Sequence, residues 1–96
     1  MMDTNEVIDK LQRIKPALQR DYAVKSVGLF GSFATGTYTD SSDVDILIEF
    51  ERPVGWRFFA LENYLEKTLN RKIDLVTANA LKEQIKPFII SQVQYI

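Results

Sequence analysis

Two short segments, one ending in a glycine-serine turn and one opening on paired acids, constrain the fold of this chain most strongly. The first segment, from Gly28 to Ser32, has the pattern of a buried strand that turns tightly into a short helix. The second begins at Asp43, and from there to Phe50 apolar residues recur at alternate positions, which predicts a strand. We therefore expect two strands joined by a turn, one turn of helix and a polar loop.

The two acids that open the second strand are expected to share one of its faces. Asp43 and Asp45 are two residues apart, and successive side chains of a strand point to opposite sides of a sheet. Two carboxylates held side by side repel each other unless a cation neutralises them. Mg²⁺ suits such a place because it usually takes one or two carboxylates together with substrate phosphates.

The glycine-serine turn and a third acid extend this candidate site. Gly31 has no Cβ, so a phosphate could approach the backbone closely, and Ser32 stands where helical N–H groups would be free. Asp74 lies between Ile73 and Leu75 in a third expected strand, and it would join the pair if that strand lies beside the second. Each residue alone has an ordinary explanation as a turn or strand residue, but together they favour a nucleotide site.

The spacing of these residues resembles a known signature. Gly31 and Ser32, ten further residues, and then Asp43 and Asp45 are similar to the GS-x10-DxD motif of the DNA polymerase β-like nucleotidyltransferase superfamily. The segment around Asp74 resembles the third-acid strand of that superfamily. A chain this short resembles the minimal nucleotidyltransferase (MNT) proteins, which are antitoxin partners of HEPN-domain toxins.

The resemblance implies a catalytic role for each acid. Asp43 and Asp45 would bind Mg²⁺, as two ions, and Asp74 would join the metal site and activate the attacking hydroxyl. Gly31 and Ser32 would bind the nucleotide beside Asp43 and Asp45. An in-line displacement at the α-phosphate of ATP would then transfer AMP and release pyrophosphate.

The resemblance also implies an acceptor and a partner. AMP would pass to a tyrosine hydroxyl of a HEPN-type RNase toxin, so the chain would be a protein adenylyltransferase and the antitoxin of a toxin–antitoxin pair. Two alternatives stay open: a non-catalytic antitoxin that silences the toxin by binding, and a small-molecule (antibiotic) nucleotidyltransferase. The shortness of the chain speaks against a small-molecule pocket, and the intact acids favour catalysis over binding alone. Thr35 stands where the family usually has a basic residue, which would weaken contact with the phosphates or the partner.

Composition limits the remaining classes of function. The 96 residues include no cysteine and no histidine, which leaves carboxylates as the obvious metal ligands and favours Mg²⁺ over Zn²⁺. Twelve basic and thirteen acidic residues give a net charge of −1, which does not favour nucleic acid as the main partner. We see no signal peptide and no membrane span, so we expect a cytoplasmic protein without membrane contact.

The order of the expected elements predicts one small α/β (α+β) domain over residues 1–96, with a nucleotidyltransferase core. We expect a mixed three-stranded sheet, helices mainly on one face, and the acids on the other. The first helix should be capped by Asp3 and kinked or divided at Pro16. We expect strands at 24–30, 44–50 and 73–76, and later helices near 33–37, 58–69, 79–85 and 87–93. Larger nucleotidyltransferases add a second domain, so here the toxin would complete the site or the chain would be a homo-oligomer.

Overall fold

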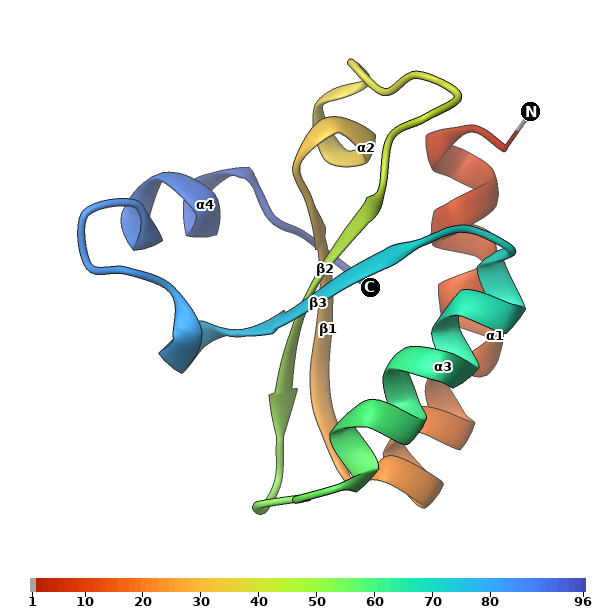
Figure 1. Ribbon diagram of the computed structural model, residues 1–96, viewed down its shortest axis with the longest axis vertical. Coiled ribbons are helices and arrows are strands. Elements are labelled where there is room, and N and C mark those ends of the chain that lie inside the picture. Colours follow the sequence, from red (N-terminus) through yellow and green to blue (C-terminus); the bar gives the residue numbers. More distant parts are fainter. Residues whose placement is uncertain (1) are drawn as a thin grey trace.

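The computed structural model describes residues 2–96, which form helices and a four-stranded sheet. The elements are α1 (Thr4–Tyr22), β1 (Val24–Phe30), α2 (Ser32–Thr35), β2 (Val44–Phe50), α3 (Arg57–Leu69), β3 (Ile73–Thr77), the 3₁₀ turn η1 (Ala78–Ala80), α4 (Lys86–Gln92) and β4 (Gln94–Tyr95). Figure 1 shows the sheet between two layers, with α1 and α3 on one side and α4 on the other. The predicted α/β class, with the long helices on one face, is confirmed.

The sheet has the strand order β3-β2-β1-β4 and is mixed, as predicted. β1 pairs antiparallel with β2 and β4, whereas β2 and β3 run parallel. The prediction of three strands was wrong, because the chain becomes extended again at Val93 and returns along β1. There the N–H of Ile96 donates to the carbonyl of Val27 at 2.9 Å. A two-residue edge strand is too short to show an alternating pattern in the sequence.

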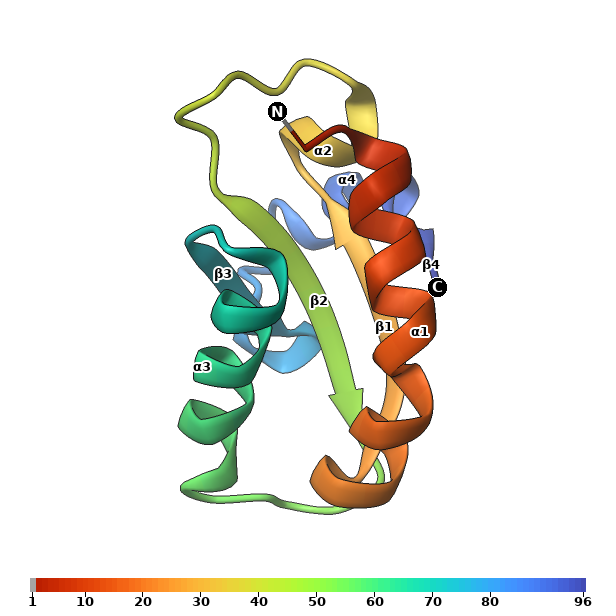
Figure 2. The same cartoon turned by 90° about the vertical axis from the view of Figure 1, so that its right-hand side faces the viewer.

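The hydrophobic core lies between the sheet and the helices α1 and α3, which Figure 2 shows side by side across the strands. One face of β2 contributes Val44, Ile46 and Ile48, all fully buried. The helices contribute side chains at helical spacing, each also fully buried: Val7, Leu11, Leu18, Leu61, Leu65 and Leu69. This packing decides which face of β2 turns inward, and it leaves the acids on the opposite face.

The first helix begins as predicted but is not divided. The Asp3 carboxylate accepts from the Glu6 N–H at 2.9 Å, which is the expected cap. Of the two outcomes expected at Pro16, a kink or a second helix, the second helix was wrong, since α1 continues through Pro16. Pro16 lies on the exposed side, where carbonyls can tilt toward water, and Leu11 and Leu18 hold the turns on either side of it against the core.

The segment after β3 departs furthest from the prediction. The helix expected at 79–85 is only the 3₁₀ turn η1, after which the backbone is extended at Leu81. α4 contains Pro87 in its first turn, as predicted, and ends before Val93. Neither η1 nor α4 contains a fully buried residue, so no apolar stripe was there to extend either helix. Among residues 2–96, no helix combines the length and the apolar character needed to cross a membrane.

Candidate active site

The predicted acids lie together on the sheet face that points away from α1 and α3. Asp45 in β2 and Asp74 in β3 are register partners, and because the strands are parallel their side chains point to the same side. Asp43 stands directly before β2. Asp43 and Asp45 are half-buried and Asp74 is exposed. The structure thus places β3 beside β2, the condition under which Asp74 was expected to join the pair.

The electrostatics of Asp45 reflect this crowding. Burial raises the pKa of its carboxyl from the ordinary 3.8 to about 6. The negative charges of Asp74 and Asp43, and a hydrogen bond between the Asp45 and Asp74 carboxyls, act in the same direction on this pKa. A cation between Asp45 and Asp74 would offset the repulsion that favours the protonated form.

The glycine-serine turn lies directly against these acids. Phe30, the residue before Gly31, is the register partner of Asp45 across β1 and β2. Gly31 has a φ of +70°, and a Cβ added there would clash with Oδ2 of Asp45. Ser32 follows as the first residue of α2, half-buried. Backbone shape and close contact therefore both require glycine at this position.

Comparison with known proteins agrees with this geometry. The sequence profile of the nucleotidyltransferase domain matches residues 11–96, which is most of the chain and includes all five candidate residues. The chain belongs to the nucleotidyltransferase domain family. One relative, from Methanocaldococcus jannaschii, is 44% identical over 82 residues, covering 84% of this chain and 95% of the relative. Its name places it provisionally among the protein adenylyltransferases.

A second relative and two solved structures each match nearly all of this chain. The protein adenylyltransferase MntA of Thermococcus cleftensis is 36% identical to this chain. The alignment covers 100% of this chain and 98% of the length of MntA. A structure provisionally described as a minimal nucleotidyltransferase has a TM-score of 0.83 at 24% identity, with 97% and 95% coverage. An MNT antitoxin in complex with the tri-AMPylated HEPN toxin of Shewanella oneidensis has a TM-score of 0.57 at 19% identity, covering 96% of this chain and 66% of that one. At these identities the two structures establish the shared fold.

The donor set of this nucleotidyltransferase fits a hard cation that arrives with a phosphate ligand. Within residues 2–96, no group of three or more acidic, histidine or cysteine side chains is gathered closely enough to hold a metal by itself. Two adjacent carboxylates, Asp45 and Asp74, with Asp43 beside them, fit Mg²⁺, which completes its shell with water and phosphate oxygens. These residues would therefore supply part of a coordination shell, with the rest coming from water and phosphate.

The helix between the two motifs is held by its aromatic residue. Phe33 is fully buried and stacks on Tyr38, with ring centroids 4.5 Å apart and planes at 1°. Phe33 therefore belongs to the hydrophobic core. Thr35 is exposed, and its hydroxyl lies 2.9 Å from that of Thr37. Position 35 therefore holds a short polar side chain that carries no charge.

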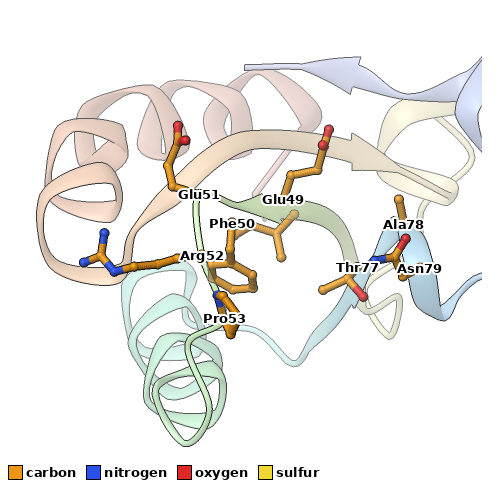
Figure 3. Close-up of a pocket in the computed structure, with 9 residues that line it drawn as sticks. Glu49, Phe50, Glu51, Arg52, Pro53, Thr77, Ala78 and Asn79 are labelled. Atoms are coloured by element: carbon orange, nitrogen blue, oxygen red, sulfur yellow. The ribbon is translucent and has the colours of Figure 1, made fainter.

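Two pockets lie at opposite ends of β2. A hollow of about 280 Å³ between residues 40–43 and 70–72 lies beside Asp43. A larger pocket of about 430 Å³ lies between the far end of β2, with the turn after it, and the end of β3; Figure 3 shows Glu49, Phe50, Thr77 and Asn79 around it. None of the five candidate residues lines the larger pocket. The acids, and not pocket size, therefore locate the candidate site.

The sequence reasoning missed one residue that lies beside the acids. This residue is Arg71, whose guanidinium donates to backbone carbonyls of the loop before β2. The only hint in the sequence is a basic residue just before the Asp74 strand. Its partners are main-chain atoms, which leave no pattern in the sequence.

Proposed function

We propose that this chain is a Mg²⁺-dependent protein adenylyltransferase that moves AMP from ATP to a protein hydroxyl group. The observation that carries the proposal is the register pairing of Asp45 with Asp74, with Gly31 packed against Asp45. Relatives at 36–44% identity that are named as protein adenylyltransferases support the same activity.

We assign the roles from where each side chain lies. Gly31 and Ser32 receive the phosphates at the turn, and Asp43 and Asp45 hold Mg²⁺, as two ions, with ATP. When bound, Mg²⁺ neutralises the charge of the phosphates and of the carboxylates. Asp74 is the exposed acid of the pair, so an incoming hydroxyl group can reach it.

The proposed step is a single displacement. The acceptor oxygen forms a bond to the α-phosphorus, the bond from that phosphorus to the bridging oxygen breaks, and pyrophosphate leaves. The acceptor proton passes to the Asp74 carboxylate as the bond forms. A tyrosine hydroxyl has a reference pKa of about 10, so it is protonated near neutral pH and gains from such a base.

The acceptor we propose is a tyrosine of a HEPN-type RNase toxin that forms a complex with this chain. Support comes from the shared fold with an MNT antitoxin bound to a tri-AMPylated HEPN toxin. The open face around Asp74 also leaves room for an acceptor brought by another protein. We place the reaction in the cytoplasm, where ATP and Mg²⁺ are available, and we treat residues 1–96 as a single catalytic domain.

A second candidate function is neutralisation of the toxin by binding alone. The observation that favours it is Thr35, which offers the nucleotide no positive charge at a position where the family usually has one. Transfer to a small molecule has less support, since the pocket of about 430 Å³ lies at the other end of β2 from Asp45.

The test combines the chain with a purified HEPN-type RNase toxin and with labelled ATP. We expect label on a toxin tyrosine, loss of label when Mg²⁺ is chelated, and loss of label with Asp45→Asn. Asp9→Asn is the matched control, because Asp9 is an exposed α1 residue paired with Arg13 at 2.9 Å.

Each alternative predicts a different result in that assay. If Asp45→Asn silences the toxin as well as the parent chain does, transfer is dispensable and the binding function is correct. A panel of aminoglycosides should give no adenylated product, and rapid turnover of any of them would favour the small-molecule function.

A further inference from the structure

The side chain of Arg71 spans from the start of the β3 segment to the loop that precedes Asp43. Its guanidinium Nη2 donates to the carbonyls of Asp40 and Ser42, each at 2.8 Å, and to that of Thr39 at 3.2 Å. These partners lie 29–32 residues away in the sequence. One cation therefore ties three carbonyls of one loop together.

The same side chain also contacts the short helix that carries Ser32. The Cζ atom of Arg71 lies 5.1 Å from the ring centroid of Phe33, in the geometry of a cation over an aromatic face. Nε of Arg71 is buried, and it has no hydrogen-bond partner within residues 2–96. The inner end of the guanidinium is thus enclosed, and its planar shape lets it lie over the ring while Nη2 donates to the carbonyls.

The backbone next to Arg71 holds the other side of Asp43. The carbonyl of Lys72 accepts from the N–H of Val44 at 2.9 Å. Asp43 therefore lies between two anchored neighbours, Ser42 held through its carbonyl by Arg71 and Val44 held through its N–H by Lys72. Asp74 follows two residues after Lys72.

The contacts of Arg71 do not fit a role in ending α3. That helix ends at Leu69, with Asn70 as a left-handed cap at φ 52°, and its basic last-turn residue is Lys67. The Arg71 hydrogen bonds go to the loop at 39–42 and not to α3 carbonyls. The contacts serve the junction between the loop and the acids.

We infer that Arg71 is a positioning residue, which fixes the loop before β2 and so sets Asp43 relative to Asp45 and Asp74. The inference rests on the proposed function, in which Asp43 and Asp45 hold Mg²⁺ with ATP and Asp74 accepts the proton of the incoming hydroxyl group. Arg71 itself touches neither substrate in this role. Removing it should loosen the loop and weaken nucleotide binding that depends on Mg²⁺, while ATP binding without metal stays unchanged.

The experiment compares Arg71→Gln and Arg71→Lys with Arg57→Gln as a matched control. Arg57 also donates to a distant backbone carbonyl, that of Asp21 at 3.0 Å, but it lies at the start of α3. The readouts are hydrogen exchange of the amides at 39–44, calorimetry with ATP with and without Mg²⁺, and AMP transfer.

We expect Arg71→Gln to speed exchange at 39–44 and to weaken Mg²⁺-dependent ATP binding by ~10–100-fold, as for residues that orient metal ligands. Arg71→Lys should be intermediate, because an ammonium lacks the planar fork. In an Asp43→Asn background, Arg71→Gln should add less than about 2-fold, since the two changes act through one residue. Arg57→Gln should match the parent.

Three results would overturn the inference. These are unchanged loop exchange in both Arg71 variants, faster exchange with unchanged Mg²⁺-dependent ATP binding, and additive effects of Arg71→Gln and Asp43→Asn. If Arg71→Gln does not fold, Arg71→Lys decides by the same readouts. If the parent chain transfers no AMP to any acceptor, the proposed function fails, and loop exchange and calorimetry still decide on Arg71.

Discussion

The two faces of β2 differ in what they contribute, although they alternate within seven residues. On one face Val44, Ile46 and Ile48 are fully buried under α1 and α3. On the other face Asp45 is half-buried, and its pKa is raised to about 6 by burial and by its acidic neighbours. One face of β2 therefore stabilises the fold through apolar burial. The other face holds Asp45 in surroundings that make its ionisation less favourable.

The acid face, which is the face of β2 that carries Asp45, is not equally accessible along the strand. Leu47 follows Asp45 on that face and is 2% exposed. Its register partner is Gly28, and Val93 occupies the space that a Cβ at Gly28 would need. The chain after α4 therefore covers the middle of this face and leaves the end with Asp45 and Asp74 accessible. The face is thus covered in its middle and open at its two ends, at the acids and at the exposed Glu49.

The largest effect is expected at Asp45. Asp45→Asn removes a proposed metal ligand, so Mg²⁺-dependent ATP binding and AMP transfer should fall together, transfer by at least ~10³-fold. The fold should be retained, because the side chain points away from the core. Calorimetry and the labelled transfer assay measure the two quantities, and full transfer by this variant would refute the ligand role.

The adjacent residue should give the opposite pattern. Ile46→Ala opens a cavity in the core, so the free energy of unfolding should fall by about 2–5 kcal/mol. The folded fraction should keep its Mg²⁺-dependent ATP affinity, since Ile46 faces α1 and α3. Urea unfolding followed by calorimetry below the transition tests this. A loss of affinity without a loss of stability would contradict the division between the two faces.

A third prediction separates backbone strain from contact with the acid. Gly31→Ala puts a Cβ against Asp45, and it should weaken Mg²⁺-dependent ATP binding by ~10–100-fold. Gly36→Ala is the matched control, because Gly36 has a similar φ of +79° but open space around the added Cβ. Both variants should lose stability, by roughly 1 kcal/mol or more. Equal losses of binding in the two variants would show that strain alone is responsible.

The smallest effect concerns pH. The folded-state pKa of Asp45, about 6, lies above the ordinary value, so the folded protein binds its proton more tightly. The stability that the folded state gains from binding the Asp45 proton more tightly is fully present below about pH 4, and it is lost as pH rises through 6. Without metal, Asp45→Asn should therefore gain stability relative to the parent between pH 4 and 7.5. We expect on the order of 1 kcal/mol, because the carboxyl is only half-buried and water screens it.

The pattern of residues was sufficient to predict some of this structure. The boundaries of β1 follow from a buried-strand pattern that ends at the glycine-serine turn, and those of β2 from alternating apolar residues after the polar loop. Both match the prediction. The long helices followed from apolar stripes of which Leu11 and Leu65 are part. Asp74 joins Asp43 and Asp45 only because β3 lies next to β2. Tertiary packing decides this strand order, so the sequence pattern alone could not predict it.

Other features left no usable signal in the sequence. The fourth strand, Gln94–Tyr95, is too short for a period, and the expected helix at 79–85 had no apolar stripe to bury. The continuity of α1 through Pro16 depends on that residue being exposed. Arg71 bonds to main-chain carbonyls, which every residue has, so no partner residue could point to it.

The measurement that tests the account most directly is the effect of Asp74→Asn on transfer and binding. The amide keeps the shape of the side chain but cannot accept the acceptor proton, so transfer should fall by ~10²–10⁴-fold. Mg²⁺-dependent ATP binding should stay close to that of the parent, because Asp43 and Asp45 remain. Glu49→Gln, on the same face but next to the larger pocket, should change neither quantity. Transfer by Asp74→Asn at the parent rate would contradict the proposed role of the acid face.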